Sequence, residues 1–298
     1  MNLFPYSAFK TVAEQKSFIK AAELLNVTPS AVSHSISNLE GELGFPLFAR
    51  MKSKIELTDN GKKMLPSVLS VLNDEEKIRQ EAALVRGLDQ GKVRIGTFSS
   101  VCINYIPGII KFYHHKYPNI QIIVYQGNYN DCFRWLKNGV VDAAFVPIPT
   151  KETLYVKPLT KDRLLCVTPK DFRTNHREFV TMEEIKNETF VMQKGDYEND
   201  TMGIIHKYGI SICAPFYSID DASIAALIES GIGIGIMPEL SLKKINNEVV
   251  TYPFNPPEFR IIGLAAPKKQ TLSPATRKFF DIVIDYFKNN QLDNLRVE

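Results

Sequence analysis

Apolar residues recur at helical spacing through the first 43 positions of the chain, and this periodicity predicts three short helices. The first two apolar rows are Tyr6, Phe9, Val12 and Ala13, then Phe18, Ala21, Ala22 and Leu25. Thr28 and Pro29 supply an N-cap hydroxyl and a first-turn proline, which open the third helix. Its predicted buried row is Val32, Ile36, Leu39 and Leu43, and Gly44 ends it.

Two helices joined by a tight turn, the second with an apolar inner row, have the form of a helix-turn-helix, whose second helix enters the major groove of DNA. The outer face of the third helix carries small and polar groups suited to base edges or phosphates. The candidate DNA-binding residues of this helix are Thr28, Pro29, Ser30, Ser33, His34 and Ser37. A solvated helix in a protein-docking module has the same pattern, so the pattern alone leaves both interpretations open.

A hairpin is predicted from residue 47 to residue 57, and cations alternate along it. We expect this two-stranded wing to carry Arg50, Lys52 and Lys54 on one side, at the reach of a phosphate backbone or a minor groove. Residues 1–60 contain six basic and six acidic side chains, so the module has no net charge. Weak nonspecific affinity for DNA and dependence on dimerisation should follow.

A long helix is predicted from residue 59 to about residue 88, where Pro66 near the start is the only proline. Its seam has alternating spacings of four and three and is apolar except for Glu75; it comprises Met64, Val68, Val71, Glu75, Ile78, Ala82 and Val85. A helix about 45 Å long cannot bury this stripe against the small winged module alone. We therefore expect a second chain to cover it in a dimer; packing on the chain's own C-terminal domain is the alternative.

Beyond residue 91, short strands alternate with amphipathic helices, which is typical of α/β folding. The predicted strands are 93–97, 120–125, 142–146, 164–168, 190–193, 210–217, 232–237 and 261–265. The predicted helices are 101–117, 130–138, 181–186, 220–230 and 274–289. Two such series indicate two lobes, with crossings at 147–158 and 265–267 that return the last helix to the first lobe.

Ligands of open α/β sheets bind outside the carboxyl ends of the strands, and polar or small residues follow several predicted strands. The candidate ligand-binding residues are Phe98, Ser99, Ser100, Gly127, Asn128, Pro147, Lys194, Asp196 and Thr201. For the two serines the alternative is an ordinary helix N-cap, and for the last three residues it is a solvated loop. We expect a small-molecule site between the lobes.

Composition and charge narrow the class of protein. The chain has 298 residues, of which 44% are hydrophobic and 23% charged, so we expect two or three folded domains. A net charge of +3 gives no global field for nucleic acid or an anionic membrane. No apolar stretch approaches the ~18 residues of a membrane span and no leader pattern opens the chain, so a cytoplasmic location without membrane partners is expected.

No catalytic or metal-binding constellation is visible, so we predict no enzyme, no metal site and no cofactor. Gly231-x-Gly233-x-Gly235 follows a helix and enters a strand, the reverse of a phosphate-binding loop. The four cysteines are at least 30 residues apart, and His114-His115 diverge on a helix without further ligands. Oxidant sensing by Cys166 or Cys213 is not favoured, because both fall in predicted strands.

The N-terminal pattern resembles the winged helix-turn-helix of LysR-type transcriptional regulators. The matching residues include Phe9, Val12-Ala13-Glu14, Ser17-Phe18, Ala21-Ala22, Leu25, the run Val27-Thr28-Pro29-Ser30-Ala31-Val32-Ser33, Leu39-Glu40, Leu43-Gly44, Leu47-Phe48, Arg50 and Leu57-Thr58-x-x-Gly61. Two departures, His34 and Ser53 in place of common arginines, bear on base preference. Looser matches such as Gly139-x-x-Asp142-Ala143-Ala144 and Gly231 to Pro238 extend the resemblance over nearly the whole chain.

The resemblance implies three parts: a DNA-binding module at residues 1–58, a dimerising linker helix and hinge at 59–91, and a two-lobed effector domain at 92–298 related to periplasmic solute-binding proteins. It implies double-stranded DNA, a small-molecule effector and RNA polymerase as partners, and a homodimer that assembles into a tetramer. It also places Ser100 where relatives often bind ligand with Ser or Thr, and Pro147 where some have a hydroxyl. The alternative is a cytoplasmic solute-binding α/β protein with an N-terminal protein-docking module.

Overall fold

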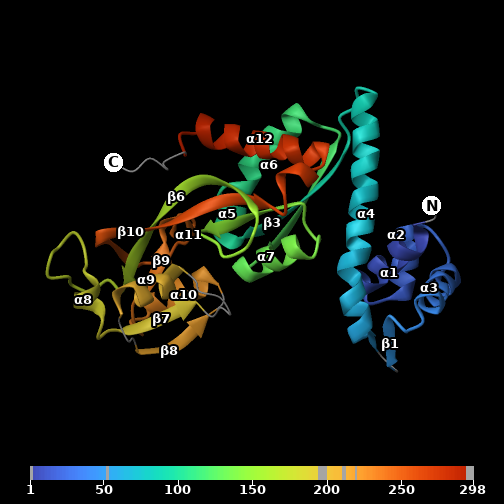
Figure 1. Ribbon diagram of the computed structural model, residues 1–298. Helices are drawn as coiled ribbons and strands as arrows, with labels where there is room; N and C mark the ends of the chain where they lie inside the picture. Colours follow the sequence, from blue (N-terminus) through green and yellow to red (C-terminus); the bar gives the residue numbers. More distant parts are fainter. Residues whose placement is uncertain (1–2, 52–53, 194–199, 210–212, 219, 293–298) are drawn as a thin grey trace.

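A winged module and a two-lobed α/β domain lie on either side of one long helix in the computed structural model, which describes residues 3–51, 54–193, 200–209, 213–218 and 220–292 (Figure 1). The winged module consists of α1 (Phe4–Gln15), α2 (Phe18–Leu25), α3 (Pro29–Leu43) and a hairpin of β1 (Phe48–Met51) and β2 (Lys54–Leu57). The hydroxyl of Ser17 accepts a hydrogen bond from the Lys20 amide, and that of Thr28 accepts one from the Ala31 amide. The predicted start of the third helix at Thr28 is therefore confirmed, and Ser17 caps α2 in the same way.

The core of the winged module is built from the predicted apolar rows. Val32, Ile36 and Leu39 of α3 are buried against residues of α1, α2 and β1, among them Phe9. The Glu40 carboxylate accepts hydrogen bonds from the backbone N–H groups at the start of the wing, with its Oε1 2.7 Å from the nitrogen of Leu47. Helix α3 and the wing are therefore held together by apolar packing and by the hydrogen bonds of the Glu40 carboxylate.

The register of the wing corrects one expectation. In the hairpin, position 50 pairs with Ile55 and Met51 pairs with Lys54. Directly opposed residues of an antiparallel pair share a face, whereas successive residues alternate, so positions 50 and 54 lie on opposite faces. The prediction that all three cations lie on one side was wrong, because it counted residues along one strand and the chain reverses between them. Lys52 lies outside the described residues.

Helix α4 (Asp59–Val85) contacts different parts of the molecule along three of its faces. Near its start, Met64, Leu65, Val68 and Leu72 pack into the core of the winged module. A second face lies against the α/β domain. The third face carries the C-terminal half of the predicted seam, where Ile78 is 68% exposed and Val85 is 88% exposed. The chain therefore buries the first half of the seam itself and leaves the second half uncovered.

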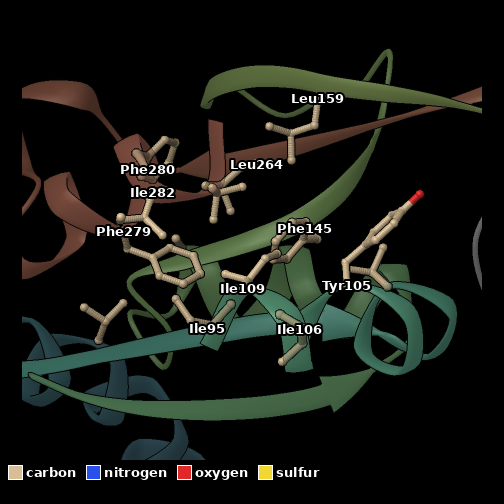
Figure 2. Packing of buried hydrophobic residues seen from close by; sticks show 14 of the residues in the cluster. Ile95, Tyr105, Ile106, Ile109, Phe145, Leu159, Leu264, Phe279, Phe280 and Ile282 are labelled. Carbon is tan, nitrogen blue, oxygen red and sulfur yellow. The ribbon is translucent and has the colours of Figure 1, made fainter. Parts of the chain in front are cut away.

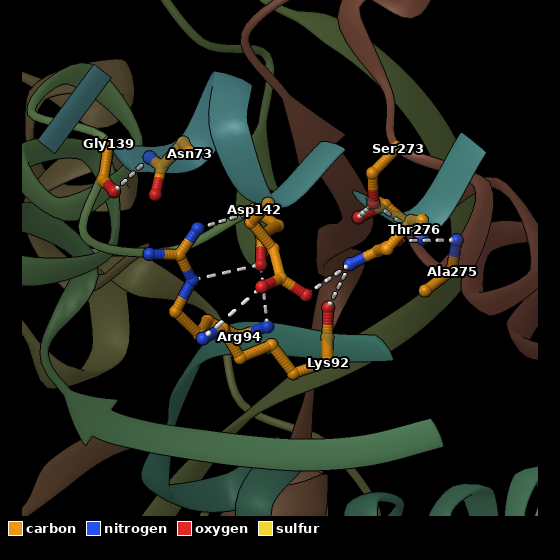
Figure 3. Close-up of polar contacts among 10 residues, drawn as sticks. Asn73, Lys92, Arg94, Gly139, Asp142, Ser273, Ala275 and Thr276 are labelled. Carbon is orange, nitrogen blue, oxygen red and sulfur yellow. Dashed lines mark hydrogen bonds and ion pairs between the residues drawn. The ribbon is translucent and has the colours of Figure 1, made fainter. Parts of the chain in front are cut away.

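The second face of α4 is joined to the α/β domain mainly by polar side chains (Figure 3). The Asn73 amide donates to the carbonyl of Gly139 at 2.8 Å. Gln80, which is buried, donates from Nε2 to the carbonyl of Lys92 at 3.1 Å and accepts at Oε1 from the amide of Ala275 at 3.2 Å. The helix is therefore fixed to three separate segments of the domain, and its orientation relative to the first lobe is set by side-chain amides.

The α/β domain is built on a six-stranded mixed sheet with strand order β4-β3-β5-β10-β6-β9 and a smaller pair, β7 and β8. The strands are β3 (Gly91–Phe98), β4 (Ile120–Gly127), β5 (Ala143–Ile148), β6 (Tyr155–Thr168), β7 (Thr189–Gln193), β8 (Cys213–Ser218), β9 (Gly235–Pro238) and β10 (Val250–Ala266). The helices are α5 (Ser99–Asn104), α6 (Ile106–Lys116), α7 (Tyr129–Lys137), α8 (Met182–Ile185), α9 (Asp200–Tyr208), α10 (Asp221–Glu229), α11 (Glu239–Leu242), a short turn η1 (Lys269–Thr271) and α12 (Pro274–Asn289).

Separate apolar cores define two lobes. The core of lobe I, which comprises residues 91–159 and 262–292, gathers Ile95, Ile109 and Phe145 under α6 and α12 (Figure 2). The core of lobe II, within residues 164–254, includes Phe190, Ile204 and Ile236. The last helix lies in lobe I beside α6, as predicted (Figure 1).

The crossings between the lobes differ from the predicted ones. They lie inside the two long antiparallel strands β6 and β10, at residues 160–163 and 255–261, and not at the predicted segments 147–158 and 265–267. The charged run Lys161-Asp162-Arg163 suggests an exposed linker, yet it continues β6 across the junction.

Two helices also differ from the prediction. Helix α9 was not predicted, and the predicted helix 101–117 is divided at Tyr105 into α5 and α6. Among the described residues, no helix is long and apolar enough to span a membrane.

Candidate functional site

The outer face of α3 carries the six candidate DNA-binding residues. Thr28, Pro29, Ser30, His34 and Ser37 are exposed and Ser33 is half-buried, while the inner row of the same helix is buried. This division follows from the helical period, since the apolar residues of α3 recur every three or four positions. A helix with an exposed polar face of this kind can enter a major groove.

Two hydrogen bonds order this face. The hydroxyl oxygens of Thr28 and Ser30 lie 3.0 Å apart, and the amide of Asn38 lies 3.3 Å from Nδ1 of His34. The sequence analysis missed Asn38, although its place one turn after His34 could have indicated it.

The three candidate residues of the wing are described only in part. Lys54 is exposed. Lys52 is outside the described residues, and for Arg50 only the backbone pairing is described.

A second cluster lies where the crossing strands meet lobe I, and Arg260 of β10 is at its centre. Its side chain is buried, with 6% of the residue exposed. It forms an ion pair with Asp162 of β6, whose Oδ2 is 2.6 Å from Nη2 and 2.8 Å from Nε. Because these two residues are opposed in the register of β6 and β10, their side chains share the face of the sheet that meets α5.

Three residues of lobe I complete this inter-lobe network, which we define as Phe98, Ser100, Tyr129, Asp162 and Arg260. Arg260 donates from Nη2 to the Ser100 hydroxyl at 2.8 Å and from Nη1 to the Tyr129 hydroxyl at 2.6 Å. Its guanidinium carbon lies 5.2 Å from the centre of the Phe98 ring, which meets the Tyr129 ring edge to face at 4.8 Å. A buried guanidinium is thus paired, hydrogen-bonded and stacked.

The start of α11 ties this network to the segment that leaves lobe II. The Leu240 amide donates to Oδ1 of Asp162 at 3.0 Å, and the Leu240 carbonyl accepts from the Asn104 amide at 2.9 Å. The Leu240 side chain is buried in the core of lobe I, although β9 just before it belongs to the lobe II half of the sheet. Relative movement of the lobes would therefore have to rearrange these hydrogen bonds.

The candidate ligand-binding residues separate into two groups. Phe98 and Ser100 belong to the inter-lobe network, and Ser99 accepts from the Gln126 amide at 3.3 Å beside it. Asn128 caps α7 by accepting from the Asp131 amide at 2.8 Å, and it forms a capping box with that residue. The hydroxyl of Thr201 is turned into lobe II and donates to the carbonyl of Ile236 at 3.0 Å. For Asn128 and Thr201 these bonds are structural, and contact of their side chains with a ligand stays a prediction.

The remaining candidates have backbone roles or are not described. Gly127 is required by close packing, because a Cβ there would lie 2.6 Å from a carboxylate oxygen of Asp131. Pro147 pairs with Ile262 in the sheet. Lys194 and Asp196 lie outside the described residues.

A second buried carboxylate on the crossing strands forms an ion pair close to this network. Glu258, two residues before Arg260 on β10, is buried and accepts at Oε1 from Nζ of Lys207 at 2.6 Å and from the Tyr208 hydroxyl at 2.8 Å. Burial and the adjacent Glu258 carboxylate raise the pKa of Tyr208 to about 12. This ion pair could not be predicted from the sequence, because α9 was not predicted.

The cysteines and acids do not form a redox or metal centre in the part of the chain that the structure describes. Burial raises the pKa of the Cys132 thiol to about 12 and raises that of Cys166 further, so neither is a reactive thiolate at neutral pH. Cys213 falls in β8, and its side chain is not described. No group of three or more His, Cys, Asp or Glu residues in the described ranges is arranged to hold a metal ion.

Comparison with known proteins matches both parts of the chain to one family. The profile of the bacterial regulatory helix-turn-helix protein, lysR family, matches residues 6–62, and that of the LysR substrate binding domain matches residues 86–288. The HTH-type transcriptional regulator YvbU of Bacillus subtilis (strain 168) is 30% identical over 290 residues, which cover 96% of this chain and 99% of YvbU.

Solved structures share the whole architecture. A variant of full-length OxyR from Pseudomonas aeruginosa is 21% identical and superposes with a TM-score of 0.75 over 97% of this chain and 95% of that one. Full-length CbnR in complex with its target DNA is 16% identical, with a TM-score of 0.66 over 96% and 100% of the two chains. At these identities the likeness concerns the fold. With the family profiles and YvbU, the conclusion is plain: the chain belongs to the LysR family of transcriptional regulators.

Proposed function

We propose that this chain binds double-stranded DNA as a homodimer through α3 and the wing, and that a small-molecule effector bound between the lobes changes that binding. The DNA-binding part of the proposal rests on the polar, exposed face of α3, which lies opposite the buried residues Val32, Ile36 and Leu39. The CbnR complex supports the proposal, since a protein of the same fold is seen there with its target DNA.

The dimer is supported by the uncovered apolar face of α4, which includes Ile78, Ala82 and Val85. A two-fold pair of winged modules doubles the number of phosphate contacts, which matters for a module whose basic and acidic residues balance. Assembly of dimers into a tetramer and contact with RNA polymerase extend the proposal by family likeness. The regulator would act in the cytoplasm, without a cofactor and without an enzymatic reaction of its own.

The effector site is proposed at the inter-lobe network because this is the place where both crossing strands, lobe I and the segment leaving lobe II meet. A ligand there can act on DNA binding only through a difference in its affinity for two arrangements of the molecule. The side-chain amides that fix α4 to lobe I give a physical connection between such an arrangement and the winged module.

Selection of genomic DNA fragments by the purified protein, followed by gel-shift titration of the best fragment, tests the DNA-binding part. Ser33→Ala should weaken binding about threefold to tenfold, because a hydroxyl at the groove surface is lost. Ser70→Ala, the same change at an exposed position of α4, is the matched control and should leave affinity unchanged. Equal affinities for wild type and Ser33→Ala, or failure to select any fragment, would reject docking through α3.

A further inference from the structure

One pair of side chains on the outer face of α3 indicates which base this helix reads, and this inference rests on the proposed function. The amide nitrogen of Asn38 lies 3.3 Å from Nδ1 of His34, one helical turn earlier, and both residues are exposed. We propose that His34 selects a guanine in each half-site by donating a hydrogen bond from Nε2, and that Asn38 is the positioning residue that turns this nitrogen outward.

The backbone beneath this pair is fixed by the core of the winged module. Val32, Ile36 and Leu39 alternate with the pair along α3, and at most 2% of each of these apolar residues is exposed. Groups that recognise a ligand are most precise on a rigid element, with rotamers that a neighbour supports. His34 meets the first condition through the packing of α3 and the second through its hydrogen bond to Asn38.

The outer face of α3 has two parallel rows in which residues lie four positions apart. The rows are Ser30, His34 and Asn38, and Ser33, Ser37 and Gly41. The second row consists of two hydroxymethyl groups and a glycine, so the imidazole and the carboxamide of the first row extend beyond it. The Ser30 hydroxyl lies 3.0 Å from that of Thr28. In a groove, His34 and Asn38 are therefore the members of these rows that reach furthest.

The contact between the two side chains assigns the proton of the imidazole ring. A carboxamide nitrogen is a donor only, so Nδ1 of His34 accepts from Asn38. In the neutral ring the single proton is then on Nε2, because the hydrogen bond at one ring nitrogen determines the state of the other. Within the described ranges, this hydrogen bond is the only one of the ring. His34 therefore presents one N–H donor to the surface where DNA would lie.

A single outward donor favours guanine. In the major groove guanine presents two adjacent acceptors, N7 and O6, whereas adenine has an amino donor beside its N7 and cytosine presents a donor. Thymine has one acceptor, O4, next to its methyl group. The Nε2–H group of His34 thus meets an acceptor along the whole outer edge of guanine. The serine hydroxyls of α3 both donate and accept, so they add affinity without selecting a base in this way.

Base preference of the wild-type protein and of His34→Ala tests the proposal. Selection from random DNA defines the preferred site, and gel-shift titration compares that site with every single base change in it. In the wild type, one G·C pair per half-site should be preferred over A·T by about fivefold or more. In His34→Ala, the two should bind within about twofold of each other. Preferences that His34→Ala leaves unchanged at every position, or a loss confined to A·T pairs, would overturn the proposal.

A double-mutant cycle tests the role of Asn38. Asn38→Ala should reduce the guanine preference to about twofold when His34 is present, because the ring is then free to turn, and should change no preference in the His34→Ala background. Ser37→Ala, in the neighbouring row, is the matched control and should keep the full preference. A full guanine preference in Asn38→Ala would contradict the positioning role. Equal loss of affinity for all bases would mean that the pair reads no base.

The same measurements separate this inference from the proposed function. If selection gives a defined site and Ser33→Ala weakens binding to it, DNA binding through α3 stands. Base preferences that are then indifferent to His34→Ala reject the guanine reading alone. If selection from random DNA gives no site, the proposed function fails, and the guanine reading fails with it.

Discussion

Gly61, in the first turn of α4, lies closer to the winged module than any side chain would allow. A Cβ at this position would be 2.2 Å from the carbonyl oxygen of Leu47 and 3.0 Å from the Leu57 side chain. The first contact involves backbone that the wing holds in place, so it cannot move aside cheaply. This glycine lets α4 approach the loop that precedes the wing, and it thereby fixes where the recognition helix and the wing lie relative to α4.

Gly61→Ala should therefore lower the free energy of unfolding, by about 1 to 3 kcal/mol, as overpacking typically does. Gly41→Ala in α3 is the matched control, since a Cβ there meets nothing within 4 Å. Because alanine is the better helix former, that control should raise stability by about 0.5 to 1 kcal/mol. Urea unfolding of the two variants checks both signs, and a neutral or stabilising Gly61→Ala would contradict the close approach.

At this scale the sequence predicts some functional positions and not others. The exposed residues of α3 follow directly from its helical period, so Ser33 and His34 could be placed from the sequence. Asp162 and Arg260 could not, because Asp162 lies in the charged run Lys161-Asp162-Arg163, which suggests solvent exposure, and nothing in the local sequence indicates that Arg260 is buried. They are buried only because β6 and β10, nearly 100 residues apart in sequence, pair across both lobes.

Helix α4 joins the DNA-binding module to lobe I, and Gln80 is central to the contact between the helix and the lobe. Its side-chain amide bonds both the start of β3 and the first turn of α12. Gly91 has a φ of +142°, and a Cβ there would lie 2.7 Å from the Gln80 side chain, so that glycine makes room for the contact. The joint is polar, which lets water replace its bonds if the helix and the lobe separate.

Gln80→Ala should leave the Ala275 amide and the Lys92 carbonyl without their partner. Leaving buried polar groups unsatisfied costs about 1 to 3 kcal/mol, and the local opening of the joint should become correspondingly more frequent. Hydrogen exchange measures this directly, and the Ala275 amide should exchange about tenfold faster or more. Arg79→Ala, an exposed neighbour on the same helix, is the control. Unchanged exchange at Ala275 would show that Gln80 does not hold the joint.

The proposed dimer rests on the exposed apolar face of α4, which includes Ile78, Ala82 and Val85. The double substitution Ile78→Asp with Val85→Asp should weaken self-association at least about tenfold, because charges would be buried in an apolar contact. Ser70→Asp, at an exposed site elsewhere on α4, should have little effect. Sedimentation velocity across a concentration series checks both. Dimers of unchanged affinity in the double variant would assign self-association to another surface.

At the scale of the whole molecule, two lobes share two long strands, and the charged pairs of those strands lie at the lobe junction. The periodic elements of this architecture could be predicted from the sequence, because apolar spacing fixes most strands and helices. The crossing points could not, because nothing local distinguishes a strand that continues into a second lobe from one that ends. Tyr105 lies beside this junction, in the core of lobe I between α5 and α6 (Figure 2).

A pH dependence follows from this tyrosine. Burial, with a contribution from the charge of Asp162, raises the pKa of Tyr105 to about 12, whereas an unfolded chain releases the proton near pH ~10. The raised pKa therefore contributes stability below pH ~10 that is lost as the pH rises from ~10 to ~12. The urea midpoint of Tyr105→Phe should fall less steeply than that of wild type over this window and in parallel below it. Parallel curves throughout would contradict the burial of this hydroxyl.

The central claim is that a two-fold pair of α3 helices reads DNA under the control of the inter-lobe site. Footprinting on DNA upstream of the protein's own gene, across a salt series and with and without pooled small metabolites, tests it most directly. We expect two protected half-sites about one helical turn apart, at ~34 Å, whose protection weakens with salt and changes when a ligand binds. A single isolated half-site, or a footprint that no inter-lobe ligand alters, would contradict it.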